Sequence, residues 1–251
     1  MATNSAFIVA FVAVTLLAGP AATQELPAYS VSKHPSQDGR CRGDSGSGDL
    51  DRSEKTCLEQ LSGVAMRQGE TLHLTLQDGN SKAYVNQAEG CESASGDCID
   101  YKLSGYFPRH GLILLQIGHY EGVEWMLVRL DGGEETKILA PPHYSPREKF
   151  LVSVCWSDGP SSCGNGIDIV ATQPDKTTPD WHYRPPANGY ELFELAGWDG
   201  DERVKLTVTF HVGRDLKTRP AWVDFTDGRW RLKMPKEYRR PAPAAWMRTR
   251  H

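Results

Sequence analysis

The sequence lacks the patterns typical of metal chemistry. Its eight histidines include no H-E-x-x-H motif and no close pair, which disfavours a zinc hydrolase. Its cysteines are spaced too widely for the short C-x-x-C type of zinc site, and the closest two, Cys91 and Cys98, are still too far apart. We therefore expect no metal and no other cofactor.

Long apolar runs are also scarce, which argues against a transmembrane span in the mature chain. A bilayer requires about 20 consecutive apolar residues, and no stretch after residue 23 provides them. The chain also lacks an N-x-[ST] glycosylation sequon, and this absence favours a bacterial source.

Residues 1–23 have the architecture of a secretory signal peptide. They carry no charged side chain, and an apolar run over residues 6–18 precedes the small residues Gly19, Ala21 and Ala22. The segment departs from the usual pattern because no Lys or Arg comes before the apolar run. We expect the protein to be exported, either to a periplasm or to the extracellular space.

The six cysteines agree with export, because an even number of cysteines in a chain with a signal segment indicates disulfides. They fall in three close pairs: Cys41 with Cys57, Cys91 with Cys98, and Cys155 with Cys163. A disulfide in each pair would close a short loop and stabilise the fold by roughly 2–4 kcal/mol. Spacing alone leaves other pairings open, and the local pairing is our prediction.

Short strands joined by tight turns dominate the rest of the chain. The 24 glycines and 16 prolines have no fixed period, which suits many turns rather than long helices. In residues 72–76 leucines alternate with polar residues before the turn Asp78-Gly79-Asn80, which predicts a hairpin. Residues 204–210 alternate similarly, so one face of that strand should be buried. Residues 58–68 have the spacing of a short helix.

The chain is organised around residues 118–156. This stretch predicts, in order, a strand at 124–130, the turn Asp131-Gly132-Gly133, a returning strand at 136–139, the turn Ser145-Pro146-Arg147-Glu148-Lys149, and a buried strand at 150–156. The glycines supply the positive φ angles that a tight hairpin requires, and proline biases Ser145 away from helix.

This order of elements resembles one blade of Tol-type and WD-repeat β-propellers, in the stretches WMLVRLDGG and HYSPREKFLVSV. The resemblance covers roughly 35 residues, about one blade at the usual repeat length. The chain is also similar to uncharacterised secreted bacterial β-proteins that carry a Tyr-Glu-Gly turn, an Asp-Gly hairpin and a Ser-Pro turn, here at Tyr120, Asp131 and Ser145. Neither likeness implies an activity.

We predict an all-β fold of antiparallel strands, arranged as an irregular or partial β-propeller or, alternatively, as a β-sandwich. The expected organisation is a signal peptide at 1–23, a disulfide-tethered N-terminal segment at 24–69, a β-rich domain at 70–234 and a basic C-terminal tail at 235–251.

The short motifs that resemble catalytic or binding sequences lack the features that their families require. The string Gly43-Asp44-Ser45-Gly46 resembles the nucleophile motif of chymotrypsin-like proteases, but only His34 precedes it, so the catalytic order of that family is absent. The overlapping Arg42-Gly43-Asp44 matches an integrin-binding tripeptide, and an ordinary Gly/Ser/Asp loop explains it. We predict no catalytic residue. A glycosidase pair drawn from Glu121, Glu124, Glu191 and Glu194 remains an alternative.

Tryptophans at turns and hairpin ends are the candidates for contact with a ligand, because exposed aromatic rings stack on sugars and anchor partners. These are Trp198, Trp222, Trp230 and Trp246, whereas we expect Trp125 and Trp156 in the core.

Charge is distributed unevenly along the chain. Residues 214–251 contain 11 Lys or Arg against 4 Asp or Glu, although the whole chain has a net charge of −4. Nucleic acid is excluded as a partner because the chain has features of export. We expect the basic segment either to associate with the acidic body of the protein or to contact an anionic envelope surface. Our leading hypothesis is a non-catalytic binding protein for an unknown protein or glycan. The alternative is a carbohydrate-active protein, either a lectin-like module or a glycoside hydrolase with a carboxylate pair.

Overall fold

The computed structural model describes residues 50–87, 98–120, 122–156, 163–173, 180–186 and 190–238. Within these ranges the chain forms fifteen β-strands, one α-helix and one 3₁₀ turn. The strands form four antiparallel sheets, which confirms the all-β prediction. The predicted signal peptide lies outside the described residues.

Each sheet is built from consecutive strands. The first contains β1 (Ala65–Gln68), β2 (Thr71–Thr75) and β3 (Ser81–Val85), and the second contains β4 (Asp100–Phe107), β5 (Leu112–His119), β6 (Gly122–Arg129) and β7 (Glu135–Ile138). The third contains β8 (His143–Tyr144), β9 (Phe150–Cys155), β10 (Gly166–Ala171) and β11 (Trp181–Tyr183). The fourth contains β12 (Leu192–Trp198), β13 (Arg203–Val212), β14 (Asp215–Thr226) and β15 (Arg229–Lys233).

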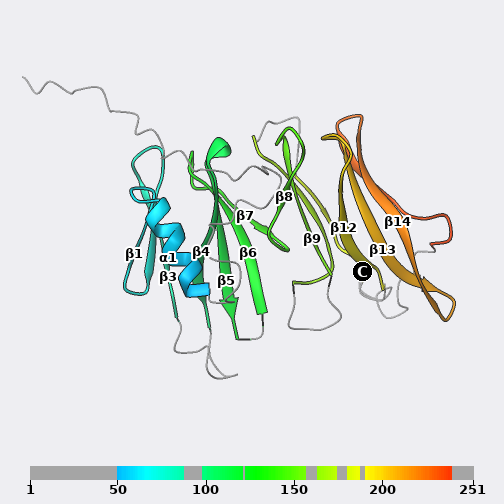
Figure 1. Cartoon of the computed structure of the whole chain (residues 1–251), viewed down its shortest axis with the longest axis horizontal. Helices are drawn as coiled ribbons and strands as arrows, with labels where there is room; N and C mark the ends of the chain where they lie inside the picture. Colours follow the sequence, from blue (N-terminus) through cyan, green and yellow to red (C-terminus); the bar gives the residue numbers. More distant parts are fainter. Residues whose placement is uncertain are drawn as a thin grey trace, which may run out of the picture.

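The four sheets stand side by side in chain order (Figure 1). The first sheet and helix α1 (Leu50–Gln60), both drawn in blue to cyan, occupy one end of the row. The fourth sheet, drawn in yellow to orange, occupies the other end. The row leaves one face of each end sheet without a neighbouring sheet.

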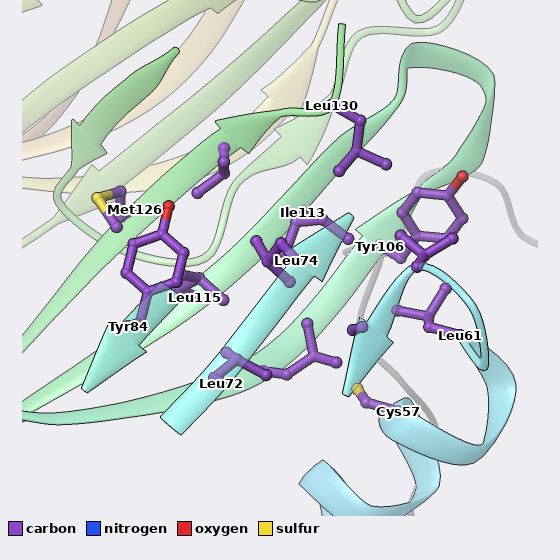
Figure 2. Close-up of a cluster of buried hydrophobic side chains, with 14 of the residues drawn as sticks. Cys57, Leu61, Leu72, Leu74, Tyr84, Tyr106, Ile113, Leu115, Met126 and Leu130 are labelled. Atoms are coloured by element: carbon purple, nitrogen blue, oxygen red, sulfur yellow. The ribbon is translucent and has the colours of Figure 1, made fainter. Parts of the chain in front are cut away.

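Apolar side chains fill the space between neighbouring sheets. The first core joins α1 and the first sheet to the second, through residues such as Cys57, Leu72 and Leu115 (Figure 2). A second core lies between the second and third sheets, and a third core lies between the third and fourth. Strand β5 is therefore buried on both faces: Ile113 faces the first core, and Leu114 faces the second. This position explains why its sequence is continuously apolar instead of alternating.

The hairpins predicted from Asp-Gly turns are present. Strands β2 and β3 pair through Leu74 and Lys82, and Gly79 has a φ of +85° in their turn. Strands β6 and β7 pair in the same way around Gly133, which has a φ of +71°. Both angles are strained for residues with a side chain, and glycine adopts them freely.

The predicted helix at 58–68 is wrong. Helix α1 occupies Leu50–Gln60, and residues 65–68 form strand β1 instead. Gly63, with a φ of +92°, redirects the chain between the two elements. Because β1 pairs with β2, the β-rich region begins within the segment that we expected to be a separate N-terminal part.

The predicted Ser-Pro turn connects three sheets. It joins β8 to β9, and the hydroxyl of Ser145 accepts hydrogen bonds from the backbone N–H groups of Lys149 and Phe150. Glu148 contacts Arg109 and His110, in the 3₁₀ turn Pro108–His110 of the second sheet, at 3.1 and 3.3 Å. The backbone N–H of Arg147 donates to Asp201, which lies between β12 and β13 in the fourth sheet, at 2.8 Å. The turn therefore helps to fix the relative positions of these sheets.

Candidate binding surface

The outer face of the fourth sheet is the strongest candidate for a binding surface. Strand β13 alternates strictly, so that Val204, Leu206, Val208 and Phe210 are buried in the third core. Lys205, Thr207 and Thr209 occupy the opposite face, because successive side chains of a strand point to opposite sides. Among the described residues no sheet packs against that face, since the fourth sheet ends the row (Figure 1).

Trp222 lies on this outer face between two lysines. It is 38% exposed and pairs across strands with Lys205 on β13 and with Lys233 on β15. Directly opposed residues in antiparallel strands have Cβ atoms about 4.5–5.5 Å apart. An indole with a lysine beside it on each neighbouring strand is therefore presented to solvent.

A row of ionic groups adjoins Trp222. Arg203 and Lys233 hold the buried carboxylate of Asp224, at 2.6 and 2.5 Å. Burial raises the pKa of Asp224, but the hydrogen bonds from Arg203 and Lys233 lower it, and the balance holds the pKa of this carboxyl below its usual range. Asp199 lies 3.7 Å from Lys205. The surface therefore carries ammonium and guanidinium groups around the indole, with one of the carboxylates buried among them.

The other predicted tryptophans lie elsewhere. Trp230 is buried, and its ring lies 4.9 Å from that of Phe150, so it supports the core and is not on the surface. Trp198 is half-buried against the same core. Trp246 lies outside the described residues.

The expectation that both Trp125 and Trp156 lie in the core holds only for Trp125, which packs against the second core. Trp156 is 46% exposed because it follows the end of β9, beyond the paired residues.

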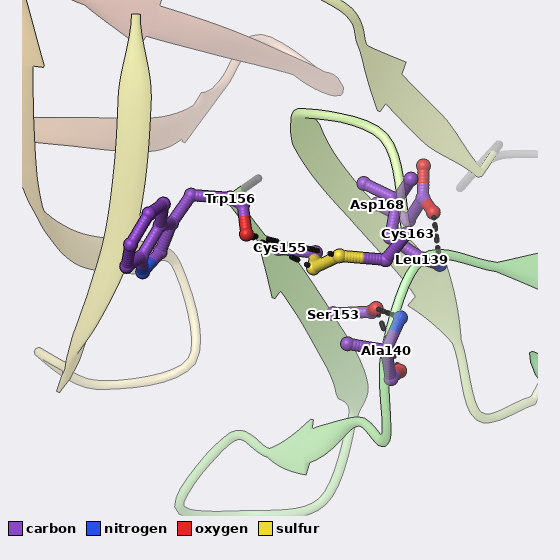
Figure 3. Close-up of a disulfide and its surroundings, with 7 residues drawn as sticks. All are labelled: Leu139, Ala140, Ser153, Cys155, Trp156, Cys163 and Asp168. Atoms are coloured by element: carbon purple, nitrogen blue, oxygen red, sulfur yellow. Dashed lines mark hydrogen bonds between the residues drawn. A yellow bond between two sulfur atoms is a disulfide. The ribbon is translucent and has the colours of Figure 1, made fainter. Parts of the chain in front are cut away.

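The third cysteine pair is confirmed. Cys155 and Cys163 form a disulfide that joins the end of β9 to the segment before β10 (Figure 3). Cys57 and Cys98 are also disulfide-bonded. The pairings predicted for them involve Cys41 and Cys91, which lie outside the described residues.

The described part of the basic C-terminal segment is folded. Residues 215–233 form β14 and β15. Tyr238 packs on Phe210 and donates a hydrogen bond from its hydroxyl to Glu191, a fully buried carboxylate. The residues from 239 onward lie outside the described part of the chain. The root of the predicted tail therefore lies against the third core.

A buried polar cluster escaped the sequence reasoning. Asp168 on β10 is 0% exposed and accepts hydrogen bonds from His182 at 2.8 Å, from Arg184 at 2.6 Å and from the backbone N–H of Leu139 at 2.9 Å (Figure 3 draws the last). The one sequence signal was an aspartate inside the otherwise apolar strand 166–171.

This cluster does not form a hydrolytic triad. Ser153 pairs with Asp168 from β9, whereas His182 pairs with Asp168 from β11, on the other side. The hydroxyl of Ser153 instead bonds to the backbone of Ala140, as Figure 3 shows. Ser153 is therefore not placed for the imidazole of His182 to activate.

The three described carboxylates considered for a glycosidase pair are separated. Glu124 lies on the second sheet and pairs with Lys137 at 2.7 Å. Glu191 is buried beside Tyr238, whereas Glu194 is exposed on the outer face of β12. Glu121 lies outside the described residues. Among the residues described, no group of three or more His, Cys, Asp or Glu side chains is arranged to hold a metal.

No protein-family model matches the chain, and no curated protein matches it significantly. No helix within the described ranges is long and apolar enough to cross a membrane.

Proposed function

We propose that this protein is exported and binds an acidic polysaccharide, without catalysis, through the outer face of its fourth sheet. The observation that carries the proposal is Trp222, an exposed indole with Lys205 and Lys233 beside it on the neighbouring strands. Tryptophan combines a large apolar ring with low conformational entropy, which makes it an effective anchor for a ligand.

The chemistry of the surrounding groups selects the ligand class. The apolar face of a sugar ring stacks on an indole, and its hydroxyl groups bond to both cationic and anionic side chains. Arg203, Lys205 and Lys233 outnumber the carboxylates of Asp199 and Asp224 that they contact by one charge, three against two, which favours carboxylate or sulfate groups near the ring. The basic residues of the C-terminal segment strengthen the attraction of an anionic envelope polymer to this end of the molecule.

Export is supported by two features. The apolar segment before the described residues has signal-peptide architecture. The Cys155–Cys163 disulfide belongs to an oxidising compartment, because thiols in the cytosol are kept reduced.

The arrangement of the sheets supports an irregular, partial propeller as the fold in preference to a sandwich. Each sheet is a meander of consecutive strands, and the sheets pack face to face in chain order. A propeller repeats four-stranded meanders in this way, whereas a sandwich consists of two sheets. The position of the Ser-Pro turn is consistent with a propeller, because the turn lies in the stretch whose sequence resembles a propeller blade.

Binding to immobilised polygalacturonate tests the function, with a neutral glucan of similar length as the reference polymer. We expect Trp222→Ala to weaken binding to polygalacturonate by about tenfold, which corresponds to about 1.4 kcal/mol. Trp222→Phe should retain part of the affinity because it keeps a ring. Trp156→Ala is the matched control, because it removes an exposed tryptophan that follows β9, away from the fourth sheet.

The ionic component is tested separately. Lys205→Ala combined with Lys233→Ala should weaken binding to polygalacturonate and reduce its dependence on salt, since the Debye length falls from about 10 Å at 0.1 M to about 3 Å at 1 M. Deleting residues 239–251 keeps Tyr238 in place and should lower affinity at low salt only. The proposal is refuted if the wild type binds neither polymer, or if Trp156→Ala and Trp222→Ala have equal effects.

A further inference from the structure

A second exposed cluster lies on the same face, at the far end of β13. It consists of Tyr190, His211 and Leu216, and we call it the distal platform. The rings of Tyr190 and His211 lie 4.9 Å apart at an interplanar angle of 56°. Leu216 pairs with His211 across β13 and β14. Tyr190 is 40% exposed and Leu216 is 54% exposed, so these apolar groups are presented to solvent.

The distal platform and Trp222 belong to one continuous surface. His211 and Lys205 are six residues apart on β13, an even number, so both side chains lie on the outer face. At about 3.4 Å per residue the two positions are about 20 Å apart along the strand. Because Lys205 pairs directly with Trp222, this is also the separation between the indole and the platform.

The residues between the two contacts are uncharged on the two central strands. Thr207 and Thr209 occupy the intervening outer positions of β13, and Thr218 and Pro220 occupy those of β14. The hydroxyls of Thr209 and Thr218 bond to each other at 2.8 Å and are exposed. The track therefore offers hydroxyl groups between an aromatic contact at one end and an aromatic and aliphatic contact at the other.

We propose that the ligand is a linear polysaccharide that lies along β13 and β14, with one sugar on Trp222 and another on the distal platform. This inference rests on the proposed function and specifies its ligand as an extended chain. A single sugar or a branched terminal group would occupy one contact only. A linear chain occupies both contacts, and the second contact adds affinity because the first already holds the chain close to it.

Size-defined oligogalacturonides, titrated against the full chain by calorimetry, test this geometry. For the wild type, affinity should rise with oligomer length until the oligomer spans about 20 Å and then level off. Tyr190→Ala combined with Leu216→Ala should leave the shortest oligomers unaffected and weaken the longest about fivefold, the effect of losing one exposed aromatic contact. Trp222→Ala should weaken all lengths.

Tyr120→Ala is the matched control, because Tyr120 is 47% exposed at the β5–β6 hairpin of the second sheet. Thermal unfolding of each variant shows whether it is folded. If wild-type affinity does not depend on length, or if Tyr120→Ala weakens the long oligomers as much as the platform variant does, the extended-chain inference is overturned while the proposed function stands. Absence of binding by every oligomer and by the polymer would refute the proposed function itself.

Discussion

Replacing Asp168 with alanine should cause a large loss of stability. Asp168 is fully buried, and its carboxylate accepts hydrogen bonds from His182, Arg184 and the backbone of Leu139. The side chains of His182 and Arg184 are about half exposed, so water can solvate them after the substitution. The backbone N–H of Leu139 belongs to a buried residue, so water cannot replace its hydrogen bond to Asp168.

The magnitude follows from these differences. Leaving the Leu139 N–H unsatisfied costs about 1–3 kcal/mol. The bonds to the two half-exposed partners contribute about 0.5–1 kcal/mol each after allowance for solvent screening. The expected loss is therefore about 3 kcal/mol of unfolding free energy, at the lower limit for breaking a buried ion pair. For a chain of this size that corresponds to a decrease in Tm of about 6–12 °C.

Urea denaturation and calorimetry, with the disulfides intact, measure this effect. Asp168→Asn should lose less than Asp168→Ala, because the amide keeps the shape and one acceptor oxygen. Asp227→Asn is the control, since Asp227 is highly exposed, lies 3.6 Å from Arg231 and has a φ of +53° that asparagine also adopts, and it should change stability by less than about 0.5 kcal/mol. If Asp168→Ala costs less than about 1 kcal/mol, the buried carboxylate does not hold the backbone N–H of Leu139 as described.

Two further substitutions test buried groups. The hydroxyl of Tyr106 is buried without a hydrogen-bond partner in the described part of the chain, and burial raises its pKa to about 12, so Tyr106→Phe should increase stability by about 1 kcal/mol in urea denaturation. Burial also lowers the pKa of His110 from 6.5, although the hydrogen bond to Glu148 opposes this. As pH falls below about 6.5 the unfolded chain binds this proton first, so wild-type stability should decline relative to His110→Gln, by at most about 1.4 kcal/mol per pH unit.

Each of these two predictions has a result that would contradict it. Tyr84→Phe is the control for Tyr106, because the Tyr84 hydroxyl donates to Glu135 at 2.8 Å and its removal should destabilise the fold. Equal losses for both variants would show that the Tyr106 hydroxyl has a partner. Parallel stability curves for wild type and His110→Gln between about pH 5 and about pH 8 would show that His110 titrates normally.

Local features of the fold were predictable, because the information for a hairpin lies within a few residues. Leu72 and Leu74 alternate with polar residues, and Gly79, which adopts the positive φ of the turn, follows a few residues later. The Ser145 turn was predictable for the same reason. The packing of one hairpin on another was not predictable, because it depends on the fit of surfaces that are distant in sequence. The burial of β5 on both faces is an example.

The binding surface was partly predictable, and one usable signal was missed. Trp222 alternates with Ala221 and Val223, which are buried, so parity places it on the outer face. Trp230 shares its face with Leu232 and alternates with Arg231, so parity places it inside. The position of a tryptophan at a hairpin end therefore predicted its exposure less well than its alternation with buried residues along the strand. The pairing of Trp222 with Lys205 could not be inferred, because it depends on the register of β13 and β14.

The row of sheets has a consequence for how the molecule loses structure. Each sheet packs mainly on its neighbours, so its stability is approximately its own contribution plus that of one or two interfaces. In the described part of the chain the two end sheets each have a single interface, so we expect them to separate while the remainder persists. The inner sheets have two, and the loss of either would divide the row. Damage at the outer face of the fourth sheet therefore remains local, whereas damage at β5 or β9 spreads in both directions along the chain.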